Sequence, residues 1–402
     1  MRMKDVIGQE PVKNHLAEML QHNRLSHALL FSGREGCGAL PLAIAFSQMI
    51  VCEKVNGKYA ATSNTSLFKN LTSPSEIKFE SCGVCPACLK AEKLAHPDIH
   101  YSFPIFPKKP GEKSVCNDFI PEWREFITQY PYGNVYDWLQ FVNAENRQGN
   151  INVYECTDII RKLNLKSFES EYKVLIMWMP EYLGNEGNKL LKLIEEPPPN
   201  TLFILVTENE SLILPTILSR TQTIRIPPLE PEDLEKALIE RARILADQAR
   251  QIASVSEGNY REALQLIQHA AEDWQVLLRD WLNTIVKTGP VAQVKWIEEI
   301  SREGREKQKQ FLRYFNHLLQ QAIRMRIMGP DSKLVISMPA NERDFADRLN
   351  KLADISQQQA IIEELDKAAY YIERNAHGKI LFHALTIKLY HIIADKSLIL
   401  MG

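Results

Sequence analysis

The chain has 402 residues, of which 45% are hydrophobic and 24% are charged, so disordered, collagen-like and disulfide-scaffold classes are excluded. Its 48 basic and 50 acidic side chains give a formal net charge of -2, which excludes a protein that coats nucleic acid by bulk charge. At roughly 150 residues per domain, this length predicts two to three domains. No run of about 18 apolar residues occurs and residues 1–10 carry no apolar leader, so we expect a cytoplasmic chain without membrane contact.

The first predicted elements surround a glycine-rich turn. Apolar positions recur with helical spacing over residues 9–24, and a continuous apolar run at 28–31 is typical of a buried parallel strand. After the turn, residues 40–51 are predicted to form a buried helix. Residues 53–80 are polar and without periodicity, which indicates an insertion. Together with the cysteine cluster that follows, it makes up a predicted insert at about 52–98.

A second insertion, rich in proline and aromatic residues, is predicted at about 101–148, and the sequence assigns it no chemical role. Helix and strand patterns then alternate, with a helix around 159–163, a strand at 172–178, a helix at 188–196 that ends at three prolines, and a strand at 202–206. This alternation predicts a mostly parallel sheet covered by helices.

Strand signals stop after residue 228. Residues 231–272 predict two or three short helices with a break at Gly258-Asn259, and the pattern from about 275 onward is helical. Its clearest apolar stripes are interpreted as core or subunit interface: Phe311, Phe315, Leu318, Leu319, Leu381, Leu385 and Leu389. The predicted fold class is therefore α/β plus all-α, in blocks 1–228, 229–274 and 275–402.

The glycine-rich turn has the position of a phosphate-binding loop but lacks its chemistry. Gly33, Gly36 and Gly38 lie between a predicted strand and a helix, where backbone N–H groups can converge on phosphate. A working loop then needs a lysine for the phosphates and a serine or threonine for magnesium. Here these two positions hold Ala39 and Leu40, so neither function is available.

The strand that normally supplies acidic residues to such a site is also altered. The predicted strand at 174–177 continues into Trp178-Met179-Pro180-Glu181, with no carboxylate at its tip to hold magnesium or polarise water. Two independent losses in one chain predict that it has no nucleotide chemistry of its own.

The spacing Cys82-x-x-Cys85-x-x-Cys88 predicts a metal site, because thiolates two residues apart in a turn can converge on one tetrahedral zinc. The candidates for the fourth ligand are Cys52, His96 and Cys116. An iron–sulfur cluster could use a similar triplet, but the Cys-Pro that follows it in ferredoxins is missing. Cys37 and Cys156 are interpreted as buried apolar residues.

Several segments carry a resemblance to a known family. They are Ile7-Gly8-Gln9-Glu10, residues 25–33, residues 188–198, Leu218-Ser219-Arg220-Thr221, residues 258–264, and Arg374-Asn375-Ala376-His377 with the helix at 381–389. On these segments the chain resembles the delta prime family of bacterial DNA polymerase III clamp loader subunits, which are AAA+ proteins. It departs from the family at Thr221, where the family has a cysteine, and in the long polar insert before the cysteines.

The resemblance implies an AAA+ core, a small helical lid at 229–274 and a helical collar for oligomerisation at 275–402. It also gives roles to three residues. Arg220 matches the arginine finger that projects toward ATP bound in a neighbouring subunit, although by spacing alone it would be a solvated surface arginine. Cys52 matches the first zinc ligand. Arg261, in the sensor 2 segment, is expected to form a lid-to-core salt bridge or to be a vestige.

The implied function is that of a subunit without intrinsic ATPase activity, within the polymerase III holoenzyme, that helps to load the sliding clamp on primed DNA. Its implied partners are the tau/gamma and delta subunits, the clamp and, through the complex, primer-template DNA; its implied cofactor is structural zinc, with no ATP in its own site. An ATP-hydrolysing, tau/gamma-like motor subunit is the alternative, and it conflicts with Ala39 and Leu40. A zinc-dependent DNA-binding module conflicts with the balanced charge.

Overall fold

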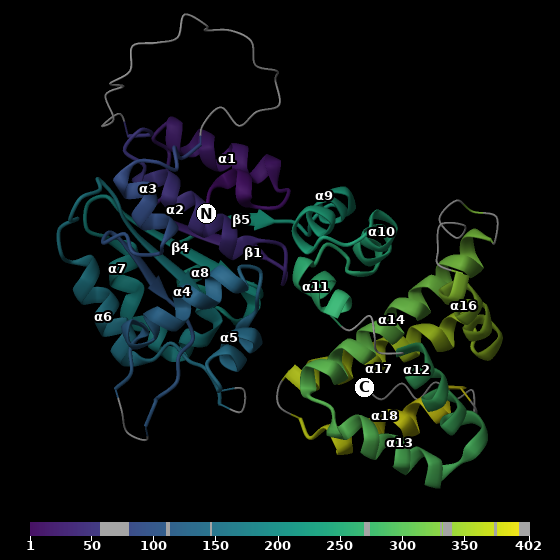
Figure 1. Cartoon of the computed structure of the whole chain (residues 1–402). Helices are drawn as coiled ribbons and strands as arrows, with labels where there is room; N and C mark the ends of the chain where they lie inside the picture. The colour runs from purple at the N-terminus through teal and green to yellow at the C-terminus, as the bar shows by residue number, and fades with distance from the viewer. Residues whose placement is uncertain are drawn as a thin grey trace, which may run out of the picture. The chain divides into compact units, whose positions relative to one another are not determined.

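A computed structural model describes residues 1–56, 80–109, 113–144, 147–268, 274–329, 332, 340–373 and 376–393. The chain divides into two compact units, Met1–Ile267 and Gln268–Gly402, and each is described by itself (Figure 1). This division lies close to the predicted boundary between blocks 229–274 and 275–402. The other predicted boundary, which separates a lid from the core after residue 228, stays a prediction.

The first unit is built on a five-stranded parallel sheet in the order β2-β3-β4-β1-β5. Three of these strands, β4, β1 and β5, are labelled in Figure 1. The strands are β1 (Ala28–Gly33), β2 (Ile99–Ser102), β3 (Lys173–Trp178), β4 (Thr201–Thr207) and β5 (Gln222–Ile226). β1, β3 and β4 read as continuous apolar runs because helices cover the sheet on both faces. The predicted parallel sheet covered by helices is confirmed, and so is the α/β plus all-α fold class.

Alternate side chains of the strands enter two separate cores. Leu29 and Phe31 of β1 face a core with α1 (Glu10–Gln21), α2 (Ala39–Val51), α3 (Pro86–Glu92), α4 (Ile120–Gln129) and α5 (Val135–Phe141). Ala28 and Leu30 face the opposite core, formed with α6 (Val153–Leu163), η3 (Pro180–Leu190), α7 (Leu191–Glu195) and α8 (Pro215–Leu218). The short 3-10 segments η1 (Met3–Asp5), η2 (Cys116–Phe119) and η4 (Glu210–Leu212) connect these elements.

The structure differs from the predicted elements in two respects. The predicted helix at 188–196 is confirmed as α-helix over Leu191–Glu195 (α7), while residues 188–190 are the 3-10 end of η3. The sequence patterns also missed the edge strands β2 and β5. In β5 only Ile224 and Ile226 are buried, so this strand lacks the apolar run that identifies the central strands.

The described residues of the predicted second insertion, 101–109 and 113–144, contribute to the core of the first unit. Phe103, Trp123, Phe126 and Trp138 are fully buried and pack on one another, with Trp123 stacked on Phe103 at a centroid distance of 4.1 Å. Trp123 also contacts the ring of Trp178 at the end of β3, 5.3 Å away. This aromatic cluster fixes the segment against the carboxyl end of the sheet.

A Trp123→Ala substitution is expected to destabilise the first unit by about 3–5 kcal/mol, because it removes a fully buried ring and leaves a cavity. The matched control is Phe168→Ala, since the Phe168 side chain is 82% exposed and its loss should change the free energy of unfolding by about 0.5 kcal/mol or less. Urea unfolding followed by circular dichroism measures both. Equal shifts of the two midpoints would contradict the assignment of the cluster to the core.

Four further helical segments complete the first unit: α9 (Pro231–Ala237), the π-helical turn η5 (Leu238–Ala242), α10 (Ala246–Val255) and α11 (Tyr260–Gln268). They share a small core of their own around Leu234, Leu238 and Ala249, which Ile7 and Tyr132 join from outside. The predicted short helices and the break at Gly258-Asn259 are confirmed.

Within its described residues, the second unit is helical. Its elements are α12 (Trp274–Asn283), the π-helical turn η6 (Thr284–Thr288), α13 (Pro290–Arg302), α14 (Arg305–Met328), α16 (Ala340–Leu352), α17 (Ile355–Glu373) and α18 (Gly378–Ile393). Trp281 and Trp296 stack at 4.8 Å in its core, and the predicted stripe of α14 from Phe311 to Leu319 is buried there. Arg374 and Asn375 of the resembling segment lie outside the described residues.

Candidate functional site

The glycine-rich turn joins β1 to α2 at the carboxyl end of the sheet, as predicted. Gly36 and Gly38 have φ of +72° and +93°, a left-handed backbone that favours glycine. Ala39 and Leu40 begin α2 and are buried. The cavity at this turn has a volume of only about 20 Å³, which is room for about one water molecule.

Side chains from distant segments fill the space over the turn. A Cβ atom placed on Gly38 would lie 3.0 Å from the ring of Tyr132, and one placed on Gly36 would lie 1.8 Å from Asn259 Oδ1. Among the side chains that line the remaining cavity, Glu208 adds a negative charge after β4. Tyr132 and Glu208 could not be connected with the turn from sequence, because no local pattern shows which distant segments fold over it.

Glu181 is the first acidic residue after β3, and its carboxylate accepts hydrogen bonds from the segment that follows β4. Its Oε1 accepts hydrogen bonds from the backbone N–H groups of Glu208 (2.8 Å) and Asn209 (2.9 Å) and from the hydroxyl of Thr207. Burial raises the pKa of Glu181, while these donors act in the opposite direction. The carboxylate therefore stabilises the turn that follows β4.

Arg261 bridges α11 and the core. Its guanidinium contacts Glu35 of the glycine-rich turn at 3.0 Å and Asp137 of α5 at 2.5 Å. The expected salt bridge between residues 229–274 and residues 1–228 is thus confirmed, and Asp137 is a partner that the sequence did not indicate.

Arg220 lies at the amino end of the sheet, whereas the glycine-rich turn lies at its carboxyl end. It follows α8 and precedes the amino end of β5, whereas the turn follows the carboxyl end of the neighbouring parallel strand β1. A six-residue strand spans about 20 Å. The Arg220 side chain therefore cannot reach the turn of its own chain.

Three neighbours hold Arg220 in a partly exposed position. Its Nε donates to Glu195 Oε1 at 2.5 Å, and its Nη1 donates to the carbonyl oxygen of Thr216 at 2.7 Å and to Ser219 Oγ at 3.1 Å. An open groove of about 680 Å³ adjoins the guanidinium. It is lined by Ser26, His27, Glu195, Ser219, Arg220, Thr221 and Gln222.

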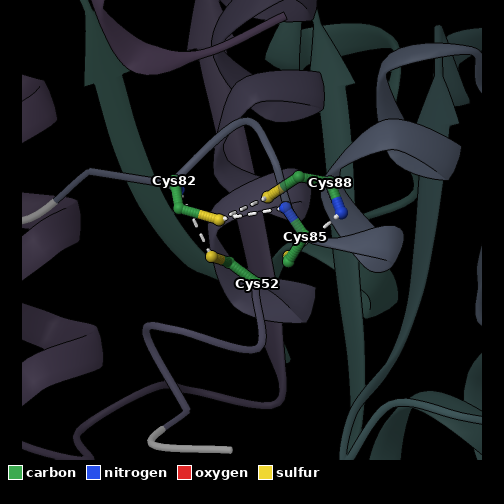
Figure 2. A group of neighbouring side chains, drawn as sticks. All are labelled: Cys52, Cys82, Cys85 and Cys88. Atoms are coloured by element: carbon green, nitrogen blue, oxygen red, sulfur yellow. Dashed lines mark hydrogen bonds between the residues drawn. The ribbon is translucent and has the colours of Figure 1, made fainter. Parts of the chain in front are cut away.

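Four cysteines converge at a second candidate site (Figure 2). Cys52 ends α2, and Cys82, Cys85 and Cys88 come from the loop before α3 and from its first turn. All four sulfur atoms lie within 4.8 Å of one another, and Cys82 Sγ is 3.9 Å from Cys88 Sγ. Four sulfurs at about 2.3 Å from a tetrahedral zinc would be about 3.8 Å apart, so this donor set fits the ion.

Backbone N–H groups point at three of these sulfurs. Cys52 Sγ accepts from the N–H of Cys82, Cys82 Sγ from that of Cys85, and Cys85 Sγ from that of Cys88, at 3.3–3.4 Å. The Cys88 thiol lowers the pKa of Cys52 by donating a hydrogen bond to it, and the same bond raises the pKa of Cys88. Burial also raises the pKa of Cys85, so the feature of the cluster that favours thiolate, the form that binds metal, is its set of backbone N–H donors.

The other candidate ligands lie away from this cluster. His96 Nδ1 accepts from the N–H of Asp98 at 3.1 Å, and its Nε2 lies 3.3 Å from Glu169. Cys116 Sγ donates to the carbonyl oxygen of Phe103 at 3.3 Å. Cys37 and Cys156 are buried as predicted. Burial raises the pKa of Cys37 to about 12 and that of Cys156 to about 11.

A search of the described helices for one that is long and apolar enough to cross a membrane finds none.

The sheet and the site define an α/β chain whose glycine-rich turn, between β1 and α2, is covered by side chains from distant segments. The profile of the family described as DNA polymerase III, delta subunit, matches residues 8–230, more than half of the chain. The chain therefore belongs to this family, as the sequence resemblance predicted.

Named relatives agree with this assignment. The chain is 26% identical over 255 residues to the DNA polymerase III subunit delta' of Bacillus subtilis, covering 62% of this chain and 58% of the relative. It is 26% identical over 327 residues to the tau subunit of the same organism, covering 80% of this chain and 46% of that relative. The chain thus spans about half the length of these relatives.

A solved structure of a gamma subunit-related protein of DNA polymerase III from Thermotoga maritima also aligns with the chain. The TM-score is 0.36 at 15% identity, and the alignment covers 93% of this chain and 98% of the other.

Proposed function

We propose that the chain is a non-hydrolysing, delta prime-like subunit of the bacterial DNA polymerase III clamp loader. The observation that carries the proposal is the family match over residues 8–230, which includes the glycine-rich turn and Arg220. In this proposal residues 1–228 form the AAA+ core, 229–274 the lid, and 275–402 the collar. The assembled partners are tau/gamma and delta subunits in the cytoplasm, and the complex loads the sliding clamp on primer-template DNA.

The filled turn supports the absence of ATP hydrolysis in this chain. Ala39 and Leu40 supply neither a cation for the phosphates nor a magnesium ligand. Glu35 and Glu208 place negative charge at the turn, where a nucleotide would bring more. A subunit without its own nucleotide cycle offers its neighbours a fixed surface against which they can move.

Arg220 is proposed to act on ATP bound by the neighbouring subunit. A guanidinium is permanently charged and donates in a planar fork, so it can stabilise the charge that develops on the γ-phosphate. Its place at the amino end of the sheet, away from the glycine-rich turn of its own chain, supports a role in trans. The contacts with Glu195, Thr216 and Ser219 hold the guanidinium beside the open groove.

Zinc is proposed as a structural cofactor held by Cys52, Cys82, Cys85 and Cys88. Four protein ligands close the coordination shell, so no position is left for substrate. The metal would join the end of α2 to α3 and fix the start of the path from residue 80 to β2.

Calorimetric titration of the purified chain with ATP and magnesium tests the non-hydrolysing assignment. We expect no saturable heat up to about 1 mM ATP, because the cavity at the turn is too small and lacks the lysine. A tau/gamma subunit titrated in the same buffer is the positive control. Stoichiometric binding by this chain would contradict the proposal.

The second candidate is an ATP-hydrolysing, tau/gamma-like motor subunit. The similarity to a tau subunit over 80% of this chain favours it. It requires backbone N–H groups alone to hold the phosphates, and it requires the side chains over Gly36 and Gly38 to move away. The same titration separates the two candidates.

A further inference from the structure

The glycine-rich turn is covered by two segments of the chain that meet over it. One is the start of α11, with Asn259, Tyr260 and Arg261, and the other is the segment from Tyr132 to Asp137 that leads into α5. Tyr260 N–H donates to the carbonyl oxygen of Gly36 at 3.2 Å, and the rings of Tyr132 and Tyr260 meet edge to face at 4.9 Å. The helices 231–267 are therefore in direct contact with the turn.

Charged groups lie at the centre of this contact. Arg261 forms a two-point contact with Asp137, Nε to Oδ2 at 2.5 Å and Nη2 to Oδ1 at 2.6 Å, and its Nη1 donates to Glu35 Oε1 at 3.0 Å. The side chain of Arg261 is 4% exposed, and those of Glu35 and Asp137 are 14% and 17% exposed. Such a paired guanidinium is costly to separate from its carboxylates, because a buried cation would be left without a counter-charge.

Neutral groups fix the two carboxylates in place. Asp137 Oδ2 accepts from the backbone N–H of Asn134 at 3.1 Å, in the capping box that starts α5. Glu35 accepts from the side-chain amides of Asn134 at 3.1 Å and Asn259 at 3.3 Å. These neutral donors therefore orient both carboxylates toward Arg261.

A guanidinium beside a helix N-terminus and a glycine-rich turn is an arrangement that attracts a polyphosphate. In this chain the carboxylates of Glu35 and Asp137 already occupy the donors of Arg261. We propose that these two carboxylates replace the nucleotide phosphate as an intramolecular counter-charge that holds helices 231–267 closed on the core when no nucleotide is bound. This gives residues 131–137 a role, because they supply Asp137 and the Asn134 amide that donates to Glu35.

The inference goes beyond the proposed function, because it concerns the isolated chain and holds whichever complex the chain joins. Its test is a Glu35→Gln/Asp137→Asn variant, which keeps the acceptor oxygens and the size of both side chains but removes their charge. The readouts are hydrogen exchange of the backbone amides in 34–40 and 231–267, and calorimetric binding of inorganic tripolyphosphate. The control is Glu235→Gln, which removes a charge from the exposed pair with Arg250 within these helices.

We expect exchange in both segments of the double variant to be at least about tenfold faster than in the unaltered chain, and tripolyphosphate to slow it again. The unaltered chain and Glu235→Gln should not respond to tripolyphosphate. An Arg261→Gln variant should show fast exchange that tripolyphosphate does not slow, which distinguishes the counter-charge from simple loosening. Near-ultraviolet circular dichroism confirms that each variant is folded.

Unchanged exchange in the folded double variant would overturn the inference, and so would slowing of the unaltered chain by tripolyphosphate. A double variant that loosens but ignores tripolyphosphate would also overturn it, because Arg261 would then not be a vacated phosphate site. These outcomes are separate from the proposed function, whose failure appears as ATP binding by the unaltered chain.

Discussion

A Cys85→Ser variant is expected to retain less than about a tenth of the zinc of the unaltered chain, which should carry about one zinc per molecule. Cys85 is fully buried and caps the N-terminus of α3, so its sulfur holds both the metal and the helix start. A serine hydroxyl stays protonated and binds zinc poorly. Zinc binding to structural sites contributes about 10–16 kcal/mol in small peptides, so the loss should loosen the whole segment 80–98.

Metal analysis of protein purified without added zinc or chelator measures this result, with limited proteolysis reporting order in segment 80–98. Cys156→Ser is the matched control, because Cys156 is also buried but lies outside the cluster. It should keep its zinc. A stoichiometric metal content in Cys85→Ser, or none in the unaltered chain, would contradict the site.

The cysteine cluster can be predicted from sequence because three of its ligands are close in the chain. The spacing of Cys82, Cys85 and Cys88 allows their sulfurs to meet in one turn, whatever the rest of the fold does. Cys52 is different, because its place depends on how α2 packs against α3. Spacing left His96 and Cys116 as rivals, the family resemblance favoured Cys52, and the packed structure brings Cys52 to the other three cysteines.

The strands of the sheet also differ in how far the local sequence predicts them. Central strands such as Val174–Met177 are covered on both faces and carry an apolar run that is visible in sequence. The edge strand β5 has exposed residues at three of its five positions, so its pattern resembles a loop. The helix at 188–196 could be predicted because Leu190 and Ile194 have helical spacing, but the 3-10 geometry of its first residues is not encoded by an apolar pattern.

Asp137 is the clearest case of a functional candidate that sequence alone does not reveal. The pattern Asn134-x-x-Asp137 indicates the start of a helix, and this much is local. Its second partner, Arg261, lies 124 residues away, and no spacing rule connects them. Contacts of this kind arise when separate helices close over one turn, so they become visible only when the fold is known.

An Arg220→Ala variant is expected to assemble normally with tau/gamma and delta subunits but to lower ATP hydrolysis at the adjacent site by about 10³-fold or more. The Arg220 side chain is partly exposed and lies at the rim of its groove, so its removal should change the free energy of unfolding by about 1 kcal/mol or less. The loss should therefore appear in turnover and not in folding. Turnover is measured in the reconstituted complex with clamp and primed DNA.

Two further variants separate charge from geometry at this position. Arg220→Lys keeps a cation but loses the planar fork, so it should recover only part of the lost rate. Glu195→Gln keeps Arg220 and an acceptor for its Nε but removes the ion pair, so it should lower the rate far less than Arg220→Ala does. If Arg220→Ala leaves stimulated turnover unchanged in a complex of normal composition, the role in trans is wrong. If Glu195→Gln has the larger effect, the acidic residue and not the arginine is the group that the neighbouring site requires.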